Sequence, residues 1–420
     1  MDITEQISAL AQNKPVAIFG TGVSGRAVQK LLNKFGIKSY FYAENENLIF
    51  DENSAKQHKL VVYSPAFRPD HKWILLAEKF GIECICETDL SALAWRGKIV
   101  AITGTNGKTT LTNFIASALK SAGFDAIAAG NIGLPLSDFC ADGNYSENSI
   151  AVFELSSFQT SRIKYLRPDA LIWTNFDADH LDWHKDLQEY FYAKINLVKN
   201  LKSKIFIAGS SVVDYAKKFN IALPDFAKIF DETICYTAPE PFSSSIQALN
   251  FTAAKIFWQC FGLKAETLEN ACKNFQLPQY RFSAPYIVGN VKFYNDSKAT
   301  NTHAAIAAIK ELVDCPNLIW LGGGKNKNCD LSNLADIIKK YCKGAVLIGQ
   351  TADILADELN KRGVKNLKAS DMQNAVEFSW NLAKDNGSVL FSPAFSSFGM
   401  FAGYAERGKS FNDAVLCLKN

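Results

Sequence analysis

Short apolar runs alternate along the chain with segments in which apolar residues recur at helical spacing. The run Pro15–Phe19 predicts a buried strand, and the apolar face from Ala27 to Phe35 predicts a helix after it. The same order of strand, glycine-rich turn and helix begins again at Lys98–Thr103. Repeated alternation of this kind predicts an α/β fold with mainly parallel sheets. Further strands are expected at Lys38–Tyr42, Leu60–Ser64, Ile82–Cys86, Ile150–Phe153, Ala170–Thr174, Val291–Tyr294, Asn317–Leu321, Ala345–Ile348 and Ser388–Phe391.

These blocks separate into three predicted domains. A chain of 420 residues is long enough for about two to four domains of ordinary size. We expect a Rossmann-like N-terminal domain at residues 1–96 and a central P-loop ATPase-like domain with a mainly parallel sheet at residues 97–279. Residues 280–420 are expected to form a C-terminal Rossmann-like α/β domain.

Charge and composition exclude several classes of protein. Lys+Arg number 45 and Asp+Glu number 42, so the net charge of +3 predicts neither a nucleic-acid face nor a membrane-binding surface. No apolar run approaches the ~20 residues that span a bilayer, and Met1–Ala11 is too polar for a signal peptide. The ten cysteines therefore predict a reduced cytoplasmic protein with buried thiols. The lone pair Cys84 and Cys86 is expected in the core rather than on a metal.

The clearest chemical motif follows the predicted strand Lys98–Thr103. Its sequence, TGTNGKTT over residues 103–110, is typical of a phosphate loop, in which glycines turn backbone N–H groups towards an anion at the start of a helix. Lys108 is expected to reach the β- and γ-phosphates of a nucleotide, and the Thr109 hydroxyl to bind Mg²⁺. The first glycine of the usual pattern is missing, because Ile102 stands in its place. The alternative is a glycine-rich turn with a solvated lysine.

The N-terminal block carries a second glycine-rich turn. GTGVSG, residues 20–25, follows a predicted strand and opens a predicted helix, as the dinucleotide fingerprint does. Glu44 lies about 20 residues further on, where a ribose-binding acid is expected. A single turn of this kind predicts a diphosphate ligand, of which NAD is one candidate. Two phosphate sites in successive domains predict two phosphorylated ligands.

Two further strand ends carry acids and a histidine. Glu154 follows Ile150–Phe153, and the sequence NFDADH at residues 175–180 follows Ala170–Thr174. Because functional groups of α/β sheets gather at strand ends, these side chains are expected beside the phosphate loop as ligands of Mg²⁺. His180 is a less usual ligand of this ion, and a hydrogen-bonding loop residue is the alternative.

Two other residues receive no chemical role from the local pattern. Lys194 lies in the helical stretch Glu189–Lys199, where position alone predicts a solvated surface lysine. His184 is expected to be structural or at the surface.

Taken in order, the motifs resemble the Mur ligases, the ATP-dependent ligases that build the peptidoglycan stem peptide. The resemblance covers almost the whole chain, and the ordered set is far more specific than any one motif. The chain is most similar to the branch that adds D-glutamate, because it has the N-terminal GTGVSG turn and lacks a DNPR element. The motifs are TGTNGKTT, ELSSFQ, NFDADHLDWH, YRF, NDSKATN, GGGKNK and SPAFSSFGMFAGYAERGKSF.

The resemblance implies a reaction, its ligands and the residues that hold them. It implies amide formation between UDP-N-acetylmuramoyl-L-alanine and D-glutamate, driven by ATP with two Mg²⁺ ions, by a cytoplasmic monomer that has no nucleic-acid partner and is not inserted in a membrane. The catalytic residues would be Lys108, His180 and Lys194, and Lys194 would be converted by CO₂ into a carbamate. One Mg²⁺ would bind Thr109 and Glu154, and the other His180 and Lys194. ATP would contact Gly104, Thr105, Asn106, Gly107, Lys108, Thr109, Thr110, Arg281, Asn295 and Asp296. The muramoyl substrate would contact Thr21, Gly22, Ser24 and Asn131, and D-glutamate would contact Lys298, Thr300, Lys327, Ser397 and Tyr404.

The chain departs from the family pattern at a few positions. Ala66 stands where a glycine is usual beside the expected uridine site, and the sequence AEN at residues 43–45 replaces an Asp/Thr/Arg cluster. Tyr404 takes the place of a frequent phenylalanine. In GGGKNK the register leaves Lys325 as an alternative to Lys327.

Other classes of function explain fewer of these motifs. A dinucleotide-dependent dehydrogenase would use only the N-terminal turn, and a P-loop NTPase module would use only the central loop. Folylpolyglutamate synthases share the central loop but lack a leading domain like residues 1–96. An assay of phosphate release with and without each substrate separates the ligase from these alternatives.

Overall fold

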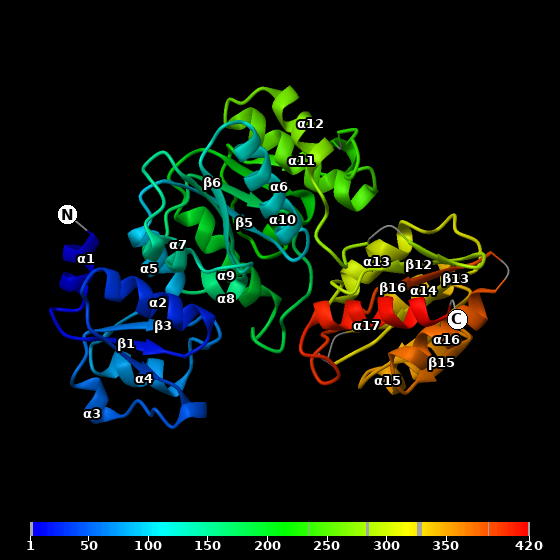
Figure 1. Ribbon diagram of the computed structural model, residues 1–420, viewed down its shortest axis with the longest axis horizontal. Coiled ribbons are helices and arrows are strands. Elements are labelled where there is room, and N and C mark those ends of the chain that lie inside the picture. Colours follow the sequence, from blue (N-terminus) through cyan, green and yellow to red (C-terminus); the bar gives the residue numbers. More distant parts are fainter. Residues whose placement is uncertain (1–2, 235, 283–284, 326–329, 385, 419–420) are drawn as a thin grey trace. The chain divides into compact units, whose positions relative to one another are not determined.

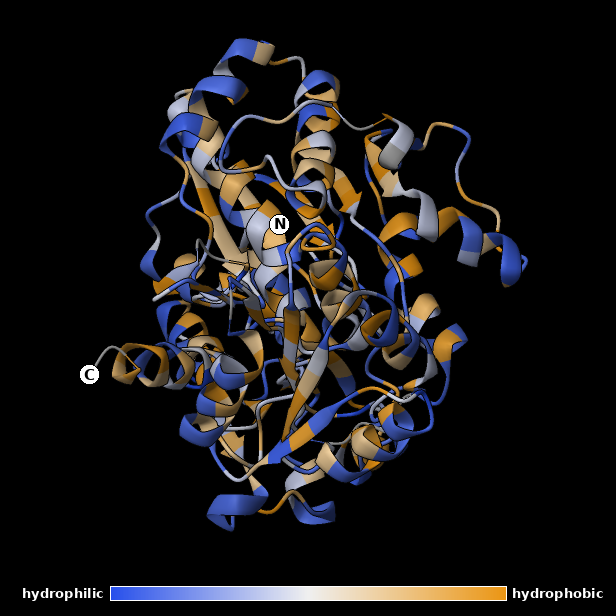
Figure 2. Cartoon of the chain, turned by 90° about the vertical axis from the view of Figure 1, so that its right-hand side faces the viewer, coloured by the Kyte–Doolittle hydropathy of each residue, from blue (hydrophilic) through white to orange (hydrophobic). Residues whose placement is uncertain are grey.

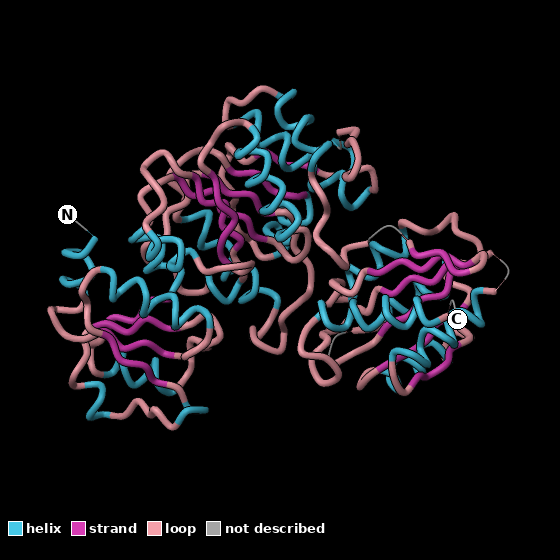
Figure 3. The backbone as a smooth tube through the Cα atoms, viewed as in Figure 1, coloured by secondary structure: helices cyan, strands magenta, loops and turns pink. Residues whose placement is uncertain are grey.

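The computed structural model describes residues 3–418, apart from residues 235, 283–284, 326–329 and 385. Its strands form three separate β-sheets with helices packed on them (Figure 1; Figure 3). Neighbouring strands in these sheets run parallel, except that β11 (Tyr286–Val288) runs antiparallel to β12 (Val291–Asn295). The predicted α/β fold with mainly parallel sheets is therefore confirmed.

The first sheet has the strand order β2-β1-β3-β4. Cys84 and Cys86 lie in its edge strand β4 as buried core residues, as predicted, and burial raises the pKa of each thiol to about 12. The strands are β1 (Val16–Phe19), β2 (Ser39–Tyr42), β3 (Leu60–Tyr63) and β4 (Glu83–Cys86). The helices are α1 (Ile3–Leu10), α2 (Val23–Lys34), α3 (Glu52–Ala55), α4 (Lys72–Lys79) and α5 (Glu87–Ala94), with a 3₁₀ turn η1 at Glu44–Glu46.

The second sheet has the strand order β10-β9-β8-β5-β7-β6. Its first strand in the chain, β5, lies at the centre, and later strands pair on both of its sides, so the carboxyl end of β5 is a topological switch point. The strands are β5 (Lys98–Thr103), β6 (Ala126–Gly130), β7 (Ile150–Glu154), β8 (Ala170–Trp173), β9 (Phe206–Gly209) and β10 (Lys228–Phe230). The helices are α6 (Lys108–Ser121), α7 (Leu136–Asp142), α8 (Ser157–Thr160), α9 (Leu187–Lys199), α10 (Ser210–Lys218), α11 (Ser245–Cys260) and α12 (Ala265–Asn274), with η2 at Glu232–Ile234.

The third sheet has the strand order β11-β12-β16-β13-β14-β15. Its strands β12, β16 and β13 are neighbours, so the segments that leave their carboxyl ends start side by side. The remaining strands are β13 (Leu318–Gly322), β14 (Gly344–Ile348), β15 (Asn366–Ala369) and β16 (Ser388–Phe391). The helices are α13 (Thr302–Lys310), α14 (Ser332–Tyr341), α15 (Ala352–Asn360), α16 (Met372–Ala383) and α17 (Tyr404–Cys417).

All the strands expected from the sequence are present, and their ends differ from the predicted ones by at most one residue. Within many helices apolar and polar residues alternate, which Figure 2 shows as orange beside blue along the same ribbon. Burial of the apolar side against a sheet supplies most of the stability of such helices. The apolar pattern therefore located the strands that it predicted, whereas β6, β9, β10, β11 and β15 were not expected from it.

The chain divides into two compact units. The first contains residues 1–176, 186–240 and 248–275, and the second contains residues 177–185, 241–247 and 276–420. A single cluster of buried apolar residues runs through both of the first two sheets, which explains why they belong to one unit. The third sheet has its own buried clusters in the second unit.

Two buried carboxylates fasten α5 to the part of the first unit that contains the second sheet. Glu87 Oε1 accepts hydrogen bonds from Ser137 Oγ at 2.5 Å and from Ser91 Oγ at 2.6 Å. The Asp89 carboxylate accepts hydrogen bonds from the backbone N–H groups of residues 164–166 at 2.8–3.1 Å. These bonds fix the first sheet relative to the second one, because each carboxylate would be costly to bury without its donors.

Replacing Asp89 tests this joint. The variant Asp89→Ala leaves the backbone N–H groups of residues 164–166 without their acceptor, so we expect it to lower the free energy of unfolding by about 3 kcal/mol. Urea denaturation followed by circular dichroism measures this. Asp413→Ala, which removes an exposed partner of Lys409, is the control and should change stability little. Equal stability of the two variants would contradict the assignment.

Candidate active site

The phosphate loop leaves the carboxyl end of β5 and enters α6, as predicted. Gly104 has φ +147° and Gly107, which precedes the helix, has φ +83°. A Cβ atom at Gly104 would lie 1.9 Å from Thr174 Oγ1, and one at Gly107 would lie 2.5 Å from Asn250 Oδ1. Both positions therefore require glycine, for backbone conformation and for space.

The residues that follow β8 hold this loop in place. Asn175 accepts hydrogen bonds from Thr105 N through its carbonyl oxygen at 3.1 Å and from Asn106 N through Oδ1 at 2.8 Å. Thr174 Oγ1 donates to Asn106 O at 2.6 Å. The loop conformation is thus built from backbone groups of one strand end and side chains of its neighbour, which preorganises it for an anion.

Lys108 and Thr109 begin α6 directly after the loop. Lys108 Nζ donates to Gly104 O at 2.8 Å and to Thr105 O at 2.9 Å, so its positive charge lies over the loop. The ammonium group is therefore placed where it can balance the charge of bound phosphates.

Glu154 ends β7, the neighbour of β5, and only 2 % of it is exposed. Its Oε1 accepts a hydrogen bond from Asn131 Nδ2 at 3.2 Å, and Asn131, which follows β6, is itself exposed. Glu154 Oε2 is buried and has no hydrogen-bond partner among the described residues. A buried carboxylate oxygen without a donor fits Mg²⁺, which prefers oxygen ligands, and the Thr109 hydroxyl has the same chemistry.

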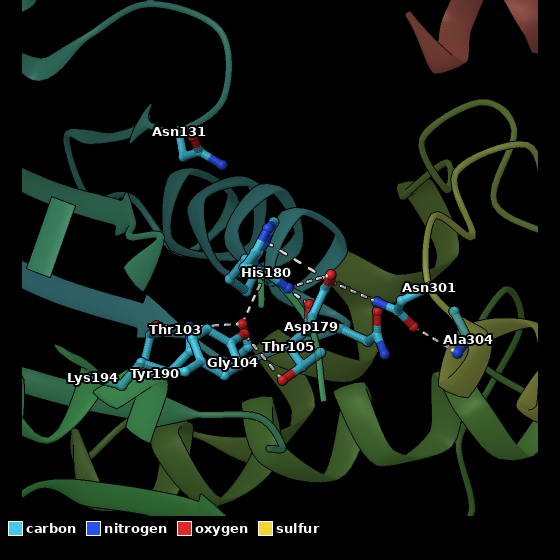
Figure 4. A network of polar contacts seen from close by, with 12 residues as sticks. Thr103, Gly104, Thr105, Asn131, Asp179, His180, Tyr190, Lys194, Asn301 and Ala304 are labelled. Atoms are coloured by element: carbon cyan, nitrogen blue, oxygen red, sulfur yellow. Dashed lines mark hydrogen bonds and ion pairs between the residues drawn. The ribbon is translucent and has the colours of Figure 1, made fainter. Parts of the chain in front are cut away.

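Lys194 is not the solvated lysine that its position alone predicts. Only 1 % of it is exposed, because it lies on the face of α9 that packs into the second sheet. Its Nζ donates to Thr103 Oγ1 and to Gly104 O, both at 3.1 Å, and lies 4.9 Å from the centre of the Tyr190 ring (Figure 4). A buried amine is thus held against the start of the phosphate loop.

His180 belongs to a segment, residues 177–185, that packs with the second compact unit. Its backbone has φ +56°, and its carbonyl oxygen accepts hydrogen bonds from Trp183 N at 3.0 Å and His184 N at 2.9 Å. Asp179 Oδ1 accepts from His180 N at 2.8 Å. The structure therefore groups His180 with the second unit, whereas Glu154 and Lys194 lie in the first.

A second cluster of expected site residues lies at the carboxyl ends of β12 and β16. Asp296 follows β12, and its carboxylate accepts a hydrogen bond from Ser392 Oγ at 2.8 Å. Burial raises the pKa of this carboxyl to about 7, although the hydrogen bond from Ser392 and the charge of Arg281 act in the opposite direction. Arg281 and Asp296, both assigned to the nucleotide, are thus within electrostatic range of each other.

Asn295 has an internal structural role. Its Nδ2 donates to Gly408 O at 2.8 Å and to Asn412 Oδ1 at 2.7 Å, and its Oδ1 accepts from Ser297 N at 3.1 Å. All the polar groups of this buried amide are used inside the protein, where they hold α17 against β12.

Arg407 in α17 has a comparable role that the sequence-based interpretation missed. It is 1 % exposed, and burial lowers the pKa of its guanidinium to about 10. It donates to Ser297 O at 2.8 Å, to Ser297 Oγ at 3.2 Å and to Phe395 O at 2.9 Å. Because Phe411, Ala414 and Val415 follow at helical spacing and are buried, the apolar face of α17 contained the signal that this arginine points inward.

The residues assigned to D-glutamate are only partly described. Lys298 Nζ lies 4.0 Å from the centre of the Tyr404 ring. The exposed Lys325 pairs with Ser396 through a backbone hydrogen bond of 2.9 Å. Ser397 is buried and Thr300 is part-buried, both in the second unit, and Lys327 lies outside the described residues.

The N-terminal turn has the geometry of a ligand-binding turn. A Cβ at Gly25 would lie 1.9 Å from Gly20 O, so this close approach requires glycine. Gly22 caps α2 with its backbone, Ser24 lies in the first turn of that helix, and Thr21 donates to Glu46 through its hydroxyl. The exposed helix N-terminus suits a diphosphate.

Two features are absent from the described residues. No helix there is long and apolar enough to cross a membrane. Among those residues there is also no group of three or more histidine, cysteine, aspartate or glutamate side chains that could hold a metal ion.

Solved structures share this fold. UDP-N-acetylmuramate–alanine ligase of Thermotoga maritima superposes with a TM-score of 0.59 at 16 % identity, covering 96 % of this chain and 99 % of the other. Folylpolyglutamate synthase of Mycobacterium tuberculosis, complexed with ADP, has a TM-score of 0.58 at 13 % identity, covering 78 % and 92 %. At these identities the likeness concerns the fold alone.

Sequence comparison is more specific. The family described as Mur ligase middle domain matches residues 102–226, and the Mur ligase glutamate ligase domain matches residues 281–395. The chain therefore belongs to the Mur ligase family. UDP-N-acetylmuramoylalanine–D-glutamate ligase of Aquifex aeolicus is 31 % identical to it over 412 residues, covering 95 % of this chain and 97 % of the relative. The enzyme of the same name from Caldicellulosiruptor bescii is 31 % identical over 454 residues, covering 96 % and 98 %.

The raised pKa of Asp296 predicts a pH dependence of stability. An unfolded chain has an aspartate pKa of ~3.9, so the folded state binds more protons at Asp296 between about pH 4 and pH 7. The contribution of this group to the free energy of unfolding therefore falls as the pH rises through that window. Asp296→Asn should remove the fall, which urea denaturation at a series of pH values measures.

The control for this experiment is Asp371→Asn. The backbone N–H of Asn374 lowers the pKa of Asp371, so its contribution has the opposite sign: it is present above the unfolded pKa and is lost as the pH falls. Parallel pH curves for wild type and Asp296→Asn would refute the raised pKa.

Proposed function

We propose that this chain joins D-glutamate to UDP-N-acetylmuramoyl-L-alanine in peptidoglycan synthesis, with ATP as the source of energy. The observation that carries the proposal is the phosphate loop, which Thr174 and Asn175 hold in place by hydrogen bonds. The neighbouring strand β7 ends at Glu154, whose buried Oε2 has no hydrogen-bond partner among the described residues. Relatives that carry the name of this activity match the chain along nearly its whole length.

Each of the three ligands is assigned mainly to residues around one sheet. We assign the muramoyl substrate to Thr21, Gly22 and Ser24 at the N-terminus of α2 and to the exposed Asn131 beside Glu154. The domains would be residues 1–96, 97–279 and 280–420, each built on one sheet. The nucleotide is assigned to residues 104–110 with Arg281 and Asp296, whereas Asn295 supports this site from inside. D-glutamate is assigned to Lys298, Thr300, Lys327, Ser397 and Tyr404.

The reaction consists of two transfers. A carboxylate oxygen of the alanyl group attacks the γ-phosphorus of ATP, the bond to the β-phosphate oxygen breaks, and ADP leaves with the electron pair. The amine of D-glutamate then attacks the acyl carbon, loses a proton, and expels inorganic phosphate as the amide forms. Lys108 balances the negative charge that gathers on the phosphoryl group, and the loop N–H groups orient it. Bound Mg²⁺ would add charge stabilisation at the phosphate oxygens.

Lys194 is assigned a modified form. Its amine would add to CO₂ through a new N–C bond and release a proton, which turns a cation into an anionic oxygen ligand. The support is its burial against Gly104 O and Thr103 Oγ1, since an unmodified ammonium group there offers no ligand to a metal. A monomeric state and a cytoplasmic location stay predictions from the sequence.

An assay of phosphate release tests the proposed reaction. Release from ATP should require both UDP-N-acetylmuramoyl-L-alanine and D-glutamate, and the ligated product should appear in equal amount. Lys108→Ala should lower kcat/KM by roughly 10³-fold, because the charge on the phosphates is lost, while the free energy of unfolding changes little. Release without the amino acid would favour a P-loop NTPase module, and an active, folded Lys108→Ala variant would refute the loop assignment.

Lys194→Ala tests the carbamate. The variant should lose most activity, and added acetate should restore part of it by supplying an oxygen ligand. NMR with ¹³C-bicarbonate should show a carbamate signal in the wild type and none in the variant. Lys199→Ala, which removes an exposed lysine of the same helix, should behave as wild type in both measurements. An active Lys194→Ala variant together with no carbamate signal in the wild type would refute the carbamate assignment.

A further inference from the structure

The segment of residues 177–185 crosses from one compact unit to the other. Residues up to 176 and from 186 onward belong to the first unit, which contains the phosphate loop and Lys194, whereas residues 177–185 pack with the second. His180 is therefore carried by the second unit, although both ends of its segment are anchored in the first.

One buried hydrogen bond fastens this segment to the second unit. Asn301 Nδ2 donates to Asp179 Oδ2 at 3.0 Å, with 6 % of Asn301 and 9 % of Asp179 exposed (Figure 4). Asn301 is also the N-cap of α13, since its Oδ1 accepts from Ala304 N at 2.9 Å. Its amide thus bridges the start of α13 and the segment that carries His180.

The other oxygen of the same carboxylate shapes the turn at His180. Asp179 Oδ1 accepts from His180 N at 2.8 Å, and the His180 carbonyl accepts from two N–H groups further along. His180 adopts φ +56°, which a residue other than glycine holds only when surrounding bonds impose it. A carboxylate fixed by Asn301 is such a constraint, so the placement of the imidazole depends on the bond.

Asn301 directly follows residues 296–300, which contain groups assigned to the nucleotide and to D-glutamate. We propose that Asp179 and Asn301 are a positioning pair that links the placement of His180 to the segment that holds D-glutamate. The inference rests on the proposed function for the identity of the ligand, but the link itself is a property of the free protein. With His180 as the Mg²⁺ ligand that the family resemblance implies, the link predicts that D-glutamate and Mg²⁺ influence each other's apparent affinity. Reciprocity of coupling requires that they do so equally.

A second contact between the same elements serves as an internal comparison. His303 Nε2 lies 3.4 Å from Asp177 Oδ2, and both side chains are substantially exposed. Exposed ion pairs contribute little to stability, whereas a buried, charge-assisted hydrogen bond stabilises the structure more. The buried pair is therefore expected to carry the link.

The experiment compares four variants by hydrogen–deuterium exchange of the metal-free, ligand-free protein. Asn301→Ser keeps a capping oxygen for Ala304 N but is too short to reach Asp179, so amide exchange within residues 177–185 should rise by about tenfold or more. Asp179→Asn leaves one side-chain oxygen for two donors, His180 N and Asn301 Nδ2, so one of the two hydrogen bonds is lost. Exchange within residues 177–185 should rise in this variant too. His303→Gln should leave exchange near the wild-type rate.

The fourth variant restores the bond in reverse. Combining Asp179→Asn with Asn301→Asp lets the new amide donate to the new carboxylate, while an oxygen remains at each position for the two backbone N–H groups. Exchange within residues 177–185 should return towards the wild-type rate. The positioning pair would be refuted if exchange in the double variant were no slower than in the single variants. It would also be refuted if Asn301→Ser exchanged at the wild-type rate.

Coupling between ligands gives the functional measurement. In the wild type the KM for D-glutamate should fall as the Mg²⁺ concentration rises, and Asn301→Ser should flatten this dependence while the KM for the muramoyl substrate changes little. A dependence that Asn301→Ser leaves intact would count against the proposal. A wild-type protein that makes no ligated product would refute the proposed function instead, and the exchange data would still decide the hydrogen bond.

Discussion

Parallel alignment of neighbouring strands is the constraint on which each candidate site depends. In the second sheet it brings the end of β5, with the phosphate loop, beside the ends of β7 and β8. The loop depends on both neighbours. Gly104 lies so close to Thr174 after β8 that only glycine fits there, and the carboxylate of Glu154 comes from β7. In the third sheet the same constraint aligns the segments after β12 and β16, where Asp296 meets Ser392.

Buried charges hold the loops that this alignment brings together. Lys194 binds the backbone at the start of the phosphate loop, Arg407 binds Ser297 and Phe395, and Asp89 binds three N–H groups of a connecting segment. Each ion satisfies backbone groups that loops leave unpaired, and each would be costly to bury without them. Rigid loops around a reactive phosphate reduce the cost of positioning substrates, which is the main demand of phosphoryl transfer.

The sequence predicted most of the strands that are buried and apolar along their length, although it missed β9 (FIAG), and it also missed several strands at the sheet edges. β15 has the sequence NLKA and is half-exposed, β10 is three residues long, and β6 consists largely of alanine. Such strands form because a neighbour offers hydrogen bonds, not because of their own pattern. Local rules alone likewise treat Lys194 and Arg407 as surface residues, although the apolar faces of their helices turn inward. Only the family resemblance assigned Lys194 to the site, and Arg407 was missed.

The sequence by itself determined the order of most strands and helices and the glycine turns, because these depend on apolar periodicity and backbone preferences over a few residues. It also carried the ordered motifs of the Mur ligases, which are residue identities and need no structure to be recognised. Only the tertiary structure decided which polar groups are buried and what they bind. Asp179 and Asn301 are 122 residues apart in the chain, and nothing local relates them. Their hydrogen bond forms because packing removes both groups from water and brings the amide of Asn301 to one oxygen of the Asp179 carboxylate.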